Sequence, residues 1–292
     1  MISRRGSGGR MRALANSPAE AREPIAAKVP EITVLFWVIK ILTTGMGEAT
    51  SDYLANTSLA LAGVVGIFGF VFAMWLQFRT RRYVAVVYWF AVMMVAVFGT
   101  MAADGLHVGL GIPYLVTTVF YAVVLAVVLC LWRRSEGTLS IHSITTRRRE
   151  TYYWLTVLAT FALGTATGDL TATSMNLGFF SSGVIFAIVI AIPAVGWWRF
   201  GLNPIFAFWF AYVVTRPLGA SFADWFGKAH SIGGGLGFGD GAVSACALVV
   251  IAALVGYVAV TRSDIQPVTD APDGALVTAQ GEPHAGTTAA GN

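Results

Sequence analysis

The sequence is poor in charged residues, and this scarcity argues against most classes of soluble protein. Only 12% of its 292 residues are Asp, Glu, Lys or Arg, whereas 56% are hydrophobic. A soluble domain contains about 25% charged residues. The composition therefore predicts an integral membrane protein.

Cysteine is also scarce, and familiar catalytic motifs are missing. Cys130 and Cys246 each lie within an apolar run, and no CxxC pair is present. We therefore expect two small buried hydrophobic residues, with neither a disulfide nor a Cys-based metal site. The chain has no HExxH motif, EF-hand loop or Gly-rich phosphate loop. These absences argue against an enzyme, and no cofactor is expected.

The formal net charge of +4 would by itself suggest an anionic partner. Sixteen Lys or Arg, however, lie in the N-terminal segment or after every second apolar run, and the alternate connections contain only Lys228. By the positive-inside rule, this pattern places both termini in the cytoplasm. We therefore expect the lipid bilayer as a partner and no nucleic acid.

The chain contains eight apolar runs, each about the length needed to cross the hydrocarbon core as a helix. A backbone in lipid must satisfy its own hydrogen bonds, so each run should be helical. The predicted fold class is an all-α polytopic membrane protein with eight transmembrane helices. The runs are roughly residues 32–53, 59–78, 83–103, 112–132, 152–169, 179–198, 204–224 and 242–261.

One pattern occurs four times: a Trp is followed ten positions later by Gly and fifteen positions later by Asp. The Trp residues are 52, 65 and 55 positions apart, which indicates an internal repeat that contains two apolar runs. The charge pattern gives all four units the same orientation, so they are parallel repeats. The copies are Trp37, Gly47 and Asp52; Trp89, Gly99 and Asp104; Trp154, Gly164 and Asp169; and Trp209, Gly219 and Asp224.

These patterns predict one transmembrane domain over residues 31–262, flanked by two disordered tails. The tails, residues 1–30 and 263–292, have no apolar periodicity. The expected repeats are about residues 31–82, 83–134, 150–199 and 203–262.

The repeated Trp and Gly residues have structural interpretations. Each Trp lies near the start of the first helix of its repeat, so we expect an interface anchor or a contact with the neighbouring repeat. Each Gly is followed four positions later by a small residue, which favours close helix packing. The alternative is a locally unwound helix beside an ion path.

The repeated Asp has two interpretations. Fifteen residues past the Trp correspond to about 22 Å of helix, close to the far side of the membrane. The Asp can end the first helix and cap the turn into the second. Alternatively, the equivalent positions of parallel repeats surround the axis, and four carboxylates form a cation-selective ring.

Other ionisable residues lie near the same level or break the repeat. Glu48 precedes Asp52 by one turn, and His107 follows Asp104 by three residues. Carboxylate and imidazole together suit Mn²⁺, Fe²⁺, Zn²⁺ or Ni²⁺. Arg216, in mid-helix directly before Pro217, is expected to balance the acidic charge or to gate the site. The positive charge of Arg216 also leaves transport of an anion as an alternative function.

Lys40 follows the first repeat Trp by three residues, near the start of its helix. We therefore expect its side chain to snorkel toward the cytoplasmic surface.

The segment PEITVLFWVIKILTTGMGEATSDYL and the four Trp-bearing two-helix units resemble a bacterial family of membrane proteins. Its members are often described as membrane-anchored proteins and are built on a repeat of unknown function. The resemblance covers about residues 29–262. It implies the fold and the bacterial inner membrane, and it supplies no activity, substrate or binding residue.

The leading functional hypothesis is an inner-membrane transporter of a small cation, foremost a divalent metal ion, with exchange for protons as an option. Its ligands or proton carriers would be the four repeat Asp residues and Glu48, with His107 as a further metal ligand and Arg216 as the balancing charge. The alternative is a non-transporting membrane scaffold or sensor in which the Asp residues are helix caps. Chemistry on lipid headgroups is a weaker third option.

Overall fold

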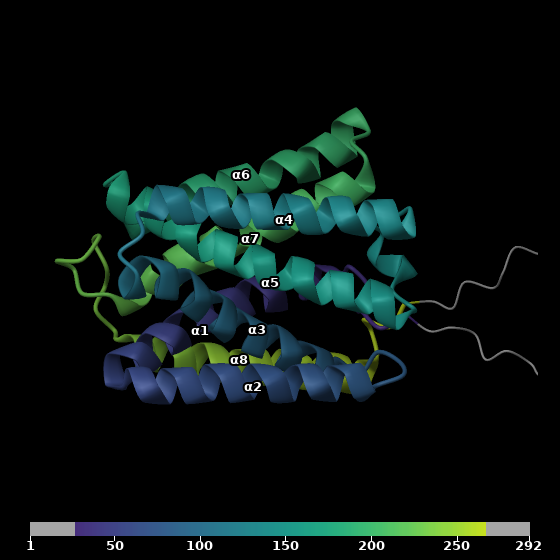
Figure 1. Ribbon diagram of the computed structural model, residues 1–292, viewed down its shortest axis with the longest axis horizontal. Helices are drawn as coiled ribbons and strands as arrows, with labels where there is room; N and C mark the ends of the chain where they lie inside the picture. Colours follow the sequence, from purple (N-terminus) through teal and green to yellow (C-terminus); the bar gives the residue numbers. More distant parts are fainter. Residues whose placement is uncertain (1–26, 267–292) are drawn as a thin grey trace, which may run out of the picture. The chain divides into compact units, whose positions relative to one another are not determined.

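The computed structural model describes residues 27–266, and the expected disordered segments 1–26 and 267–292 lie outside this range. The described residues form eight long α-helices and contain no β-strand (Figure 1). Their bounds are α1 Val34–Thr57, α2 Leu59–Arg79, α3 Ala85–Asp104, α4 Tyr114–Glu136, α5 Arg147–Asp169, α6 Phe179–Phe200, α7 Pro204–Gly227 and α8 Asp240–Thr261. Each of the eight predicted apolar runs is a helix.

The first helices of the four repeats, α1, α3, α5 and α7, form an inner ring in chain order, and α7 closes the ring on α1. Each second helix packs mainly against the first helix of the next repeat: α2 on α3, α4 on α5, α6 on α7 and α8 on α1 (Figure 1). All four repeats run in the same direction. This cyclic arrangement agrees with the parallel repeats expected from the sequence.

Inner helices approach one another at the repeated glycines. A Cβ added at any of the four would lie 2.1–2.6 Å from a side-chain atom of the neighbouring inner helix. Each Gly faces the residue that lies seven positions after the Trp of the next repeat. The pairs are Gly47 with Ala96, Gly99 with Phe161, Gly164 with Arg216 and Gly219 with Thr44. The glycines therefore set the spacing of the inner ring.

Three of the four repeat Trp residues are buried, which corrects their interpretation as interface anchors. Trp89, Trp154 and Trp209 are 1%, 4% and 6% exposed, and their rings contact aromatic residues of neighbouring helices. They pack between repeats, the other role considered for them, because adjacent aromatic residues surround them. Trp37 is half-buried against Phe208.

The two cysteines are also placed differently from the prediction. Cys130 and Cys246 are free and exposed, on the outer helices α4 and α8. These helices are apolar on their outer faces too, so an apolar run there does not imply burial inside the protein.

Seven helices, α2 to α8, are long and apolar enough to cross a membrane, which indicates a multi-pass membrane protein. Helix α1 is not among the seven. It carries Lys40, Glu48 and Asp52, which lower its hydropathy, and it lies in the inner ring where these side chains meet protein. The expected count of eight spanning helices is therefore supported for seven of them.

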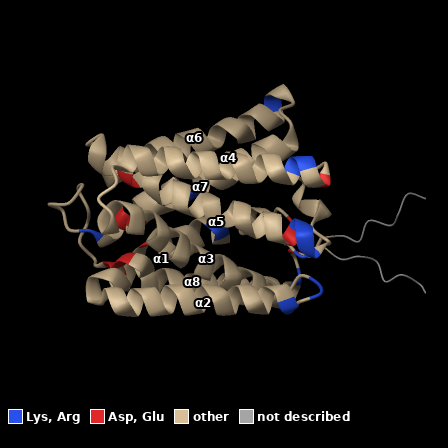
Figure 2. Cartoon of the chain, in the orientation of Figure 1, with Lys and Arg blue, Asp and Glu red and all other residues tan. Residues whose placement is uncertain are grey.

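Charge separates along the helices (Figure 2). We call the end where the inner helices begin the basic end, and the end where they finish the carboxylate end. The carboxylate end has Lys228 and the repeat Asp residues. The described basic residues of the basic end are Lys28, Arg79, Arg81, Arg82, Arg133, Arg134, Arg147, Arg148, Arg149, Arg199 and Arg262.

Short segments beyond α1 and α8 are folded against the basic end, which corrects the expected tail boundaries. Lys28 Nζ donates to Glu150 Oε2 at 2.6 Å, and Gln77 Nε2 donates to Glu150 Oε1 at 3.1 Å. Asp264 accepts a hydrogen bond from the Tyr83 hydroxyl. Residues 27–30 and 263–266 are thus ordered by buried polar contacts, which the tail composition did not reveal.

Replacement of Lys28 by Met should destabilise the protein by about 3–5 kcal/mol, because it leaves the buried Glu150 carboxylate without its cation. A thermal melt in detergent measures the effect. The double variant K28M/E150M should recover most of the loss, since no buried charge remains. Equal stability of K28M and the unaltered protein would show that the pair is not needed.

Candidate functional site

The inner helices share one inward-facing stripe. Counted from the repeat Trp, positions −1, +3, +7 and +11 lie about one helical turn apart on the same face. All sixteen residues at these positions are buried. Repeat by repeat, they are Phe36, Lys40, Thr44 and Glu48; Tyr88, Val92, Ala96 and Thr100; Tyr153, Val157, Phe161 and Thr165; and Phe208, Tyr212, Arg216 and Ala220.

Contacts between opposite helices place this stripe on the axis of the inner ring. The Lys40 ammonium of α1 lies 4.4 Å from the ring centre of Phe161 on α5. Arg216 Nη2 of α7 lies 3.4 Å from Thr100 Oγ1 on α3. Because each pair spans the ring diagonally, these side chains fill its centre.

Glu48 is held at the +11 level by two hydroxyls in the same register. Thr100 Oγ1 and Thr165 Oγ1 each donate to Glu48 Oε2 at 3.0 Å, and the two hydroxyls lie 3.2 Å apart. Glu48 is 3% exposed. Three repeats therefore supply one polar layer of oxygen atoms across the axis.

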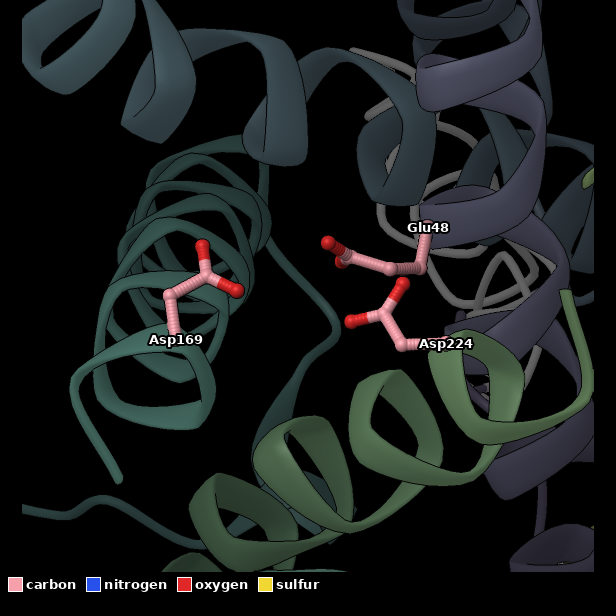
Figure 3. Close-up of side chains that lie close together, drawn as sticks. All are labelled: Glu48, Asp169 and Asp224. Atoms are coloured by element: carbon pink, nitrogen blue, oxygen red, sulfur yellow. The ribbon is translucent and has the colours of Figure 1, made fainter. Parts of the chain in front are cut away.

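Two repeat Asp residues join Glu48 one turn nearer the carboxylate end. Glu48 on α1, Asp169 at the end of α5 and Asp224 on α7 each place one carboxylate oxygen within 4.8 Å of the other two. Their carboxyl groups point toward one another (Figure 3). We call these three residues the carboxylate cluster.

Asp224 gives an independent indication that the cluster is incomplete without a ligand. The residue is 4% exposed, and its Oδ1 is buried with no hydrogen-bond partner among the described residues. An unpaired buried carboxylate oxygen is costly. Three carboxylates at this separation also repel one another unless protons or a cation neutralise them. A small cation would satisfy both requirements.

The donor set favours a hard cation. The cluster and the adjoining Thr100 and Thr165 offer oxygen only, the donor type that suits Mg²⁺ and Mn²⁺. Imidazole does not contribute. His107 lies in the π-helical turn Gly105–Gly109, where its Nδ1 is 2.7 Å from the Ile112 carbonyl and its ring stacks on Tyr114. The structure thus does not bring His107 to the cluster.

The four repeat Asp residues do not form the expected symmetric ring. Asp52 pairs with Lys228, whose Nζ is also 3.3 Å from Asp240 Oδ2. Asp104, at the end of α3, lies outside the cluster. The ring is broken because the connection after α7 returns to α1 and supplies Lys228 to one of the four Asp residues.

Lys228 is held as a cation by its surroundings. Burial by itself would lower the pKa of Lys228, but the carboxylates of Asp52, Asp224 and Asp240 outweigh it and raise the pKa above its usual value. The Lys228 side chain therefore stays protonated and keeps its ion pair with Asp52.

The alternative role of the repeat Asp residues fits the structure only in part: Asp104 and Asp169 are the last residues of α3 and α5, but no repeat Asp caps a second helix. The residues at the N-caps of α2, α4, α6 and α8 are Ser58, Pro113, Gly178 and Gly239. Asp104 and Asp169 are followed by π-helical turns, and neither side chain makes a cap hydrogen bond there. π-Helical turns are rare and often occur at functional sites.

Arg216 lies one layer below Glu48 and is fully buried. Its Nη1 donates to the Thr44 carbonyl at 3.2 Å, and its guanidinium carbon lies 3.5 Å from the centre of the Phe161 ring. Among the described residues, no carboxylate lies within 4.0 Å of it. The Thr100 hydroxyl separates Arg216 from Glu48, so its charge acts on the acid through one intervening group.

Thr100, Thr165 and Phe161 were not among the residues predicted from the sequence, and the prediction for Lys40 was wrong. Lys40 is fully buried and does not snorkel. A usable signal was present, because Thr100 and Thr165 have the same offset from their Trp as Glu48. Another Thr recurs six positions after the Trp in three repeats, but Thr43, Thr160 and Thr215 each donate to a carbonyl of their own helix.

A family model described as Repeat of Unknown Function (DUF347) matches four segments of the chain, residues 35–83, 87–138, 152–202 and 207–264. The chain belongs to this repeat family. Each matched segment of the DUF347 repeat starts within an inner helix and contains the outer helix that follows it. No curated protein and no solved structure matches the chain.

Proposed function

We propose that this protein transports a small cation across a bacterial inner membrane, with a divalent metal ion as the first candidate. The observation that carries the proposal is the convergence of Glu48, Asp169 and Asp224, from three different repeats, to within 4.8 Å. Ionisable residues inside apolar helices are costly, and they mark ion or proton pathways in membrane proteins. All three residues of the site lie within the repeats.

The orientation follows from the charges. By the positive-inside rule, the basic end faces the cytoplasm, and the carboxylate cluster then lies toward the opposite side. The negative cluster attracts cations from that side. Its oxygen ligands replace part of the hydration shell of a dehydrating ion.

The axis is closed on the cytoplasmic side of the cluster. Phe161, Arg216 and Lys40 fill the two layers beneath Glu48, and all three are fully buried. A cation at the cluster is therefore separated from the basic end by two basic side chains and an aromatic ring. Passage requires these layers to rearrange, as expected for alternating access between packed repeats. In this proposal Arg216 balances the acidic charge when no cation is bound.

Flux into proteoliposomes tests the proposal. The panel contains Mn²⁺, Fe²⁺, Zn²⁺, Ni²⁺, Mg²⁺ and H⁺, measured for the unaltered protein and for Glu48→Gln. We expect uptake of at least one cation, reduced about a hundredfold or more in Glu48→Gln, because one of three charged ligands is lost.

The matched control is Glu136→Gln, the same substitution in an acid that pairs with Arg148 and Arg149 at the basic end. It should keep full flux. If the folded, unaltered protein moves none of these ions, a non-transporting scaffold or sensor becomes the better explanation.

A further inference from the structure

Lys40 is not a ligand of the cation site described above, and its position is unusual. It is 0% exposed and lies on the ring axis. Its Nζ is 3.4 Å from Thr215 Oγ1, and otherwise faces the rings of Tyr212 and Phe161 at 4.1 and 4.4 Å. Among the described residues, no carboxylate lies within 4.0 Å of it.

Such an environment allows a lysine to exchange its proton. Burial of an ammonium without an anion costs free energy, and release of the proton removes that cost. Two aromatic faces and one hydroxyl recover part of it for the protonated form. Arg216, in the next layer, keeps its charge and adds repulsion. Lys40 is thus a buried basic side chain on the ring axis, and it can change its charge by gaining or losing one proton.

The charged and polar groups around Lys40 determine how its protonation responds to nearby changes. From α7 it faces Tyr212 and Arg216, and from α5 it faces the Phe161 ring. Its own helix supplies Glu48 two turns away, toward the cluster. Helix α8, which also packs on α1, has its acidic residue at its first position, Asp240.

Hydroxyl groups lie between Lys40 and the basic end. Tyr212 shares its layer, and one turn below it Tyr88 and Tyr153 join α3 to α5 through a hydrogen bond between their hydroxyls. Nearer still to the basic end, the Tyr83 hydroxyl donates to Asp264. These hydroxyls offer a route for a proton toward the cytoplasmic side.

We propose that Lys40 is the proton carrier that couples cation movement to proton movement, an inference that rests on the proposed function. When the carboxylate cluster is empty, its negative charge favours the protonated amine. When a cation binds, that attraction is lost, the N–H bond breaks with its electron pair left on nitrogen, and the proton leaves toward the basic end. Occupation of the cluster by a cation and protonation of Lys40 therefore exclude each other.

The size of the coupling follows from geometry. Lys40 and Glu48 are eight residues apart on α1, about 12 Å along the helix. At an effective dielectric constant of about 20, each unit charge on the cation changes the protonation equilibrium of Lys40 about tenfold. A divalent cation would change it about a hundredfold.

Proton release on binding provides the test. Mn²⁺ is titrated into the detergent-solubilised full chain, and both bound metal and released protons are counted. Lys40→Met and Lys40→Arg should still bind Mn²⁺ but release about one proton fewer per ion, because Met carries no proton and Arg does not give its proton up. The Arg variant keeps the positive charge and covers the case in which Lys40→Met does not fold.

The outcomes separate the two proposals. If either folded variant releases as many protons per Mn²⁺ as the unaltered protein, Lys40 is not the carrier, while the cation site stands. If the unaltered protein binds no Mn²⁺, the proposed function fails for this ion and the coupling role fails with it. In vesicles, a pH gradient should drive Mn²⁺ uptake by the unaltered protein and not by the Lys40 variants.

Discussion

Asp169→Asn should raise the thermal midpoint of the cation-free protein by a few degrees and abolish the further stabilisation given by Mn²⁺. Asp169 lies within 4.8 Å of two other carboxylates, and neutralising it removes their repulsion. For fully charged groups the repulsion is about 3 kcal/mol for each pair at an effective dielectric constant of about 20, and protons on the empty cluster reduce it. The same change removes a ligand, so cation affinity should fall about a hundredfold or more.

Asp104→Asn is the matched control for this prediction. Asp104 has the same offset from its repeat Trp, ends its α-helix in the same way and is followed by a π-helical turn, but it lies outside the cluster. Its Asn variant should keep most of the Mn²⁺-dependent shift. Melting curves with and without Mn²⁺ give both quantities. Identical behaviour of the two Asn variants would mean that the cluster is not the binding site.

Gly164→Ala should strongly destabilise the protein, although it adds one methyl group. The new Cβ would lie 2.1 Å from Arg216 Cβ and 3.2 Å from its Cα, positions that a side-chain rotation cannot clear. Helices α5 and α7 would have to separate, at a cost of about 3 kcal/mol or more. Because these helices carry Asp169 and Asp224, surviving protein should also bind the cation more weakly.

The control is Gly63→Ala on the outer helix α2, where an added Cβ meets nothing within 4 Å. That change should be neutral or should stabilise the protein by about 0.5–1 kcal/mol, since Ala is the better helix former. Thermal melts and size-exclusion profiles of both variants provide the comparison. A stable Gly164→Ala protein with unchanged cation binding would contradict the close contact between α5 and α7.

Helix positions were predictable because hydrophobic length and repeat spacing are local properties of the sequence. The positions of the helix ends were less predictable. Helix α5 begins at Arg147, five residues before the predicted run, because Thr146 caps it and three arginines continue the helix outside the apolar segment. Helix α4 extends to Glu136 and stops at Gly137, whose φ of 71° favours glycine.

The candidate site was only partly predictable. The Trp–Gly–Asp spacing identified the correct helices and included Asp169 and Asp224 among its candidates, and Glu48 was predicted separately from its position one turn before Asp52. It could not separate Asp169 and Asp224 from Asp52, because Asp52 is engaged by Lys228, a residue 176 positions later in the chain. It also could not show that Lys40 is buried, since burial depends on how α5 and α7 close over α1.

The cyclic contact between repeats has a consequence for how the chain is built. Each outer helix covers the inner helix of the following repeat, and α8 covers α1 just as α2 covers α3. No single two-helix unit therefore buries its own inner face. The first and last described segments also meet, since the Glu31 backbone N–H donates to the Asp264 carbonyl at 2.8 Å. The architecture is topologically a closed circle, and a circular permutant that opens it between α4 and α5 would retain every contact between repeats.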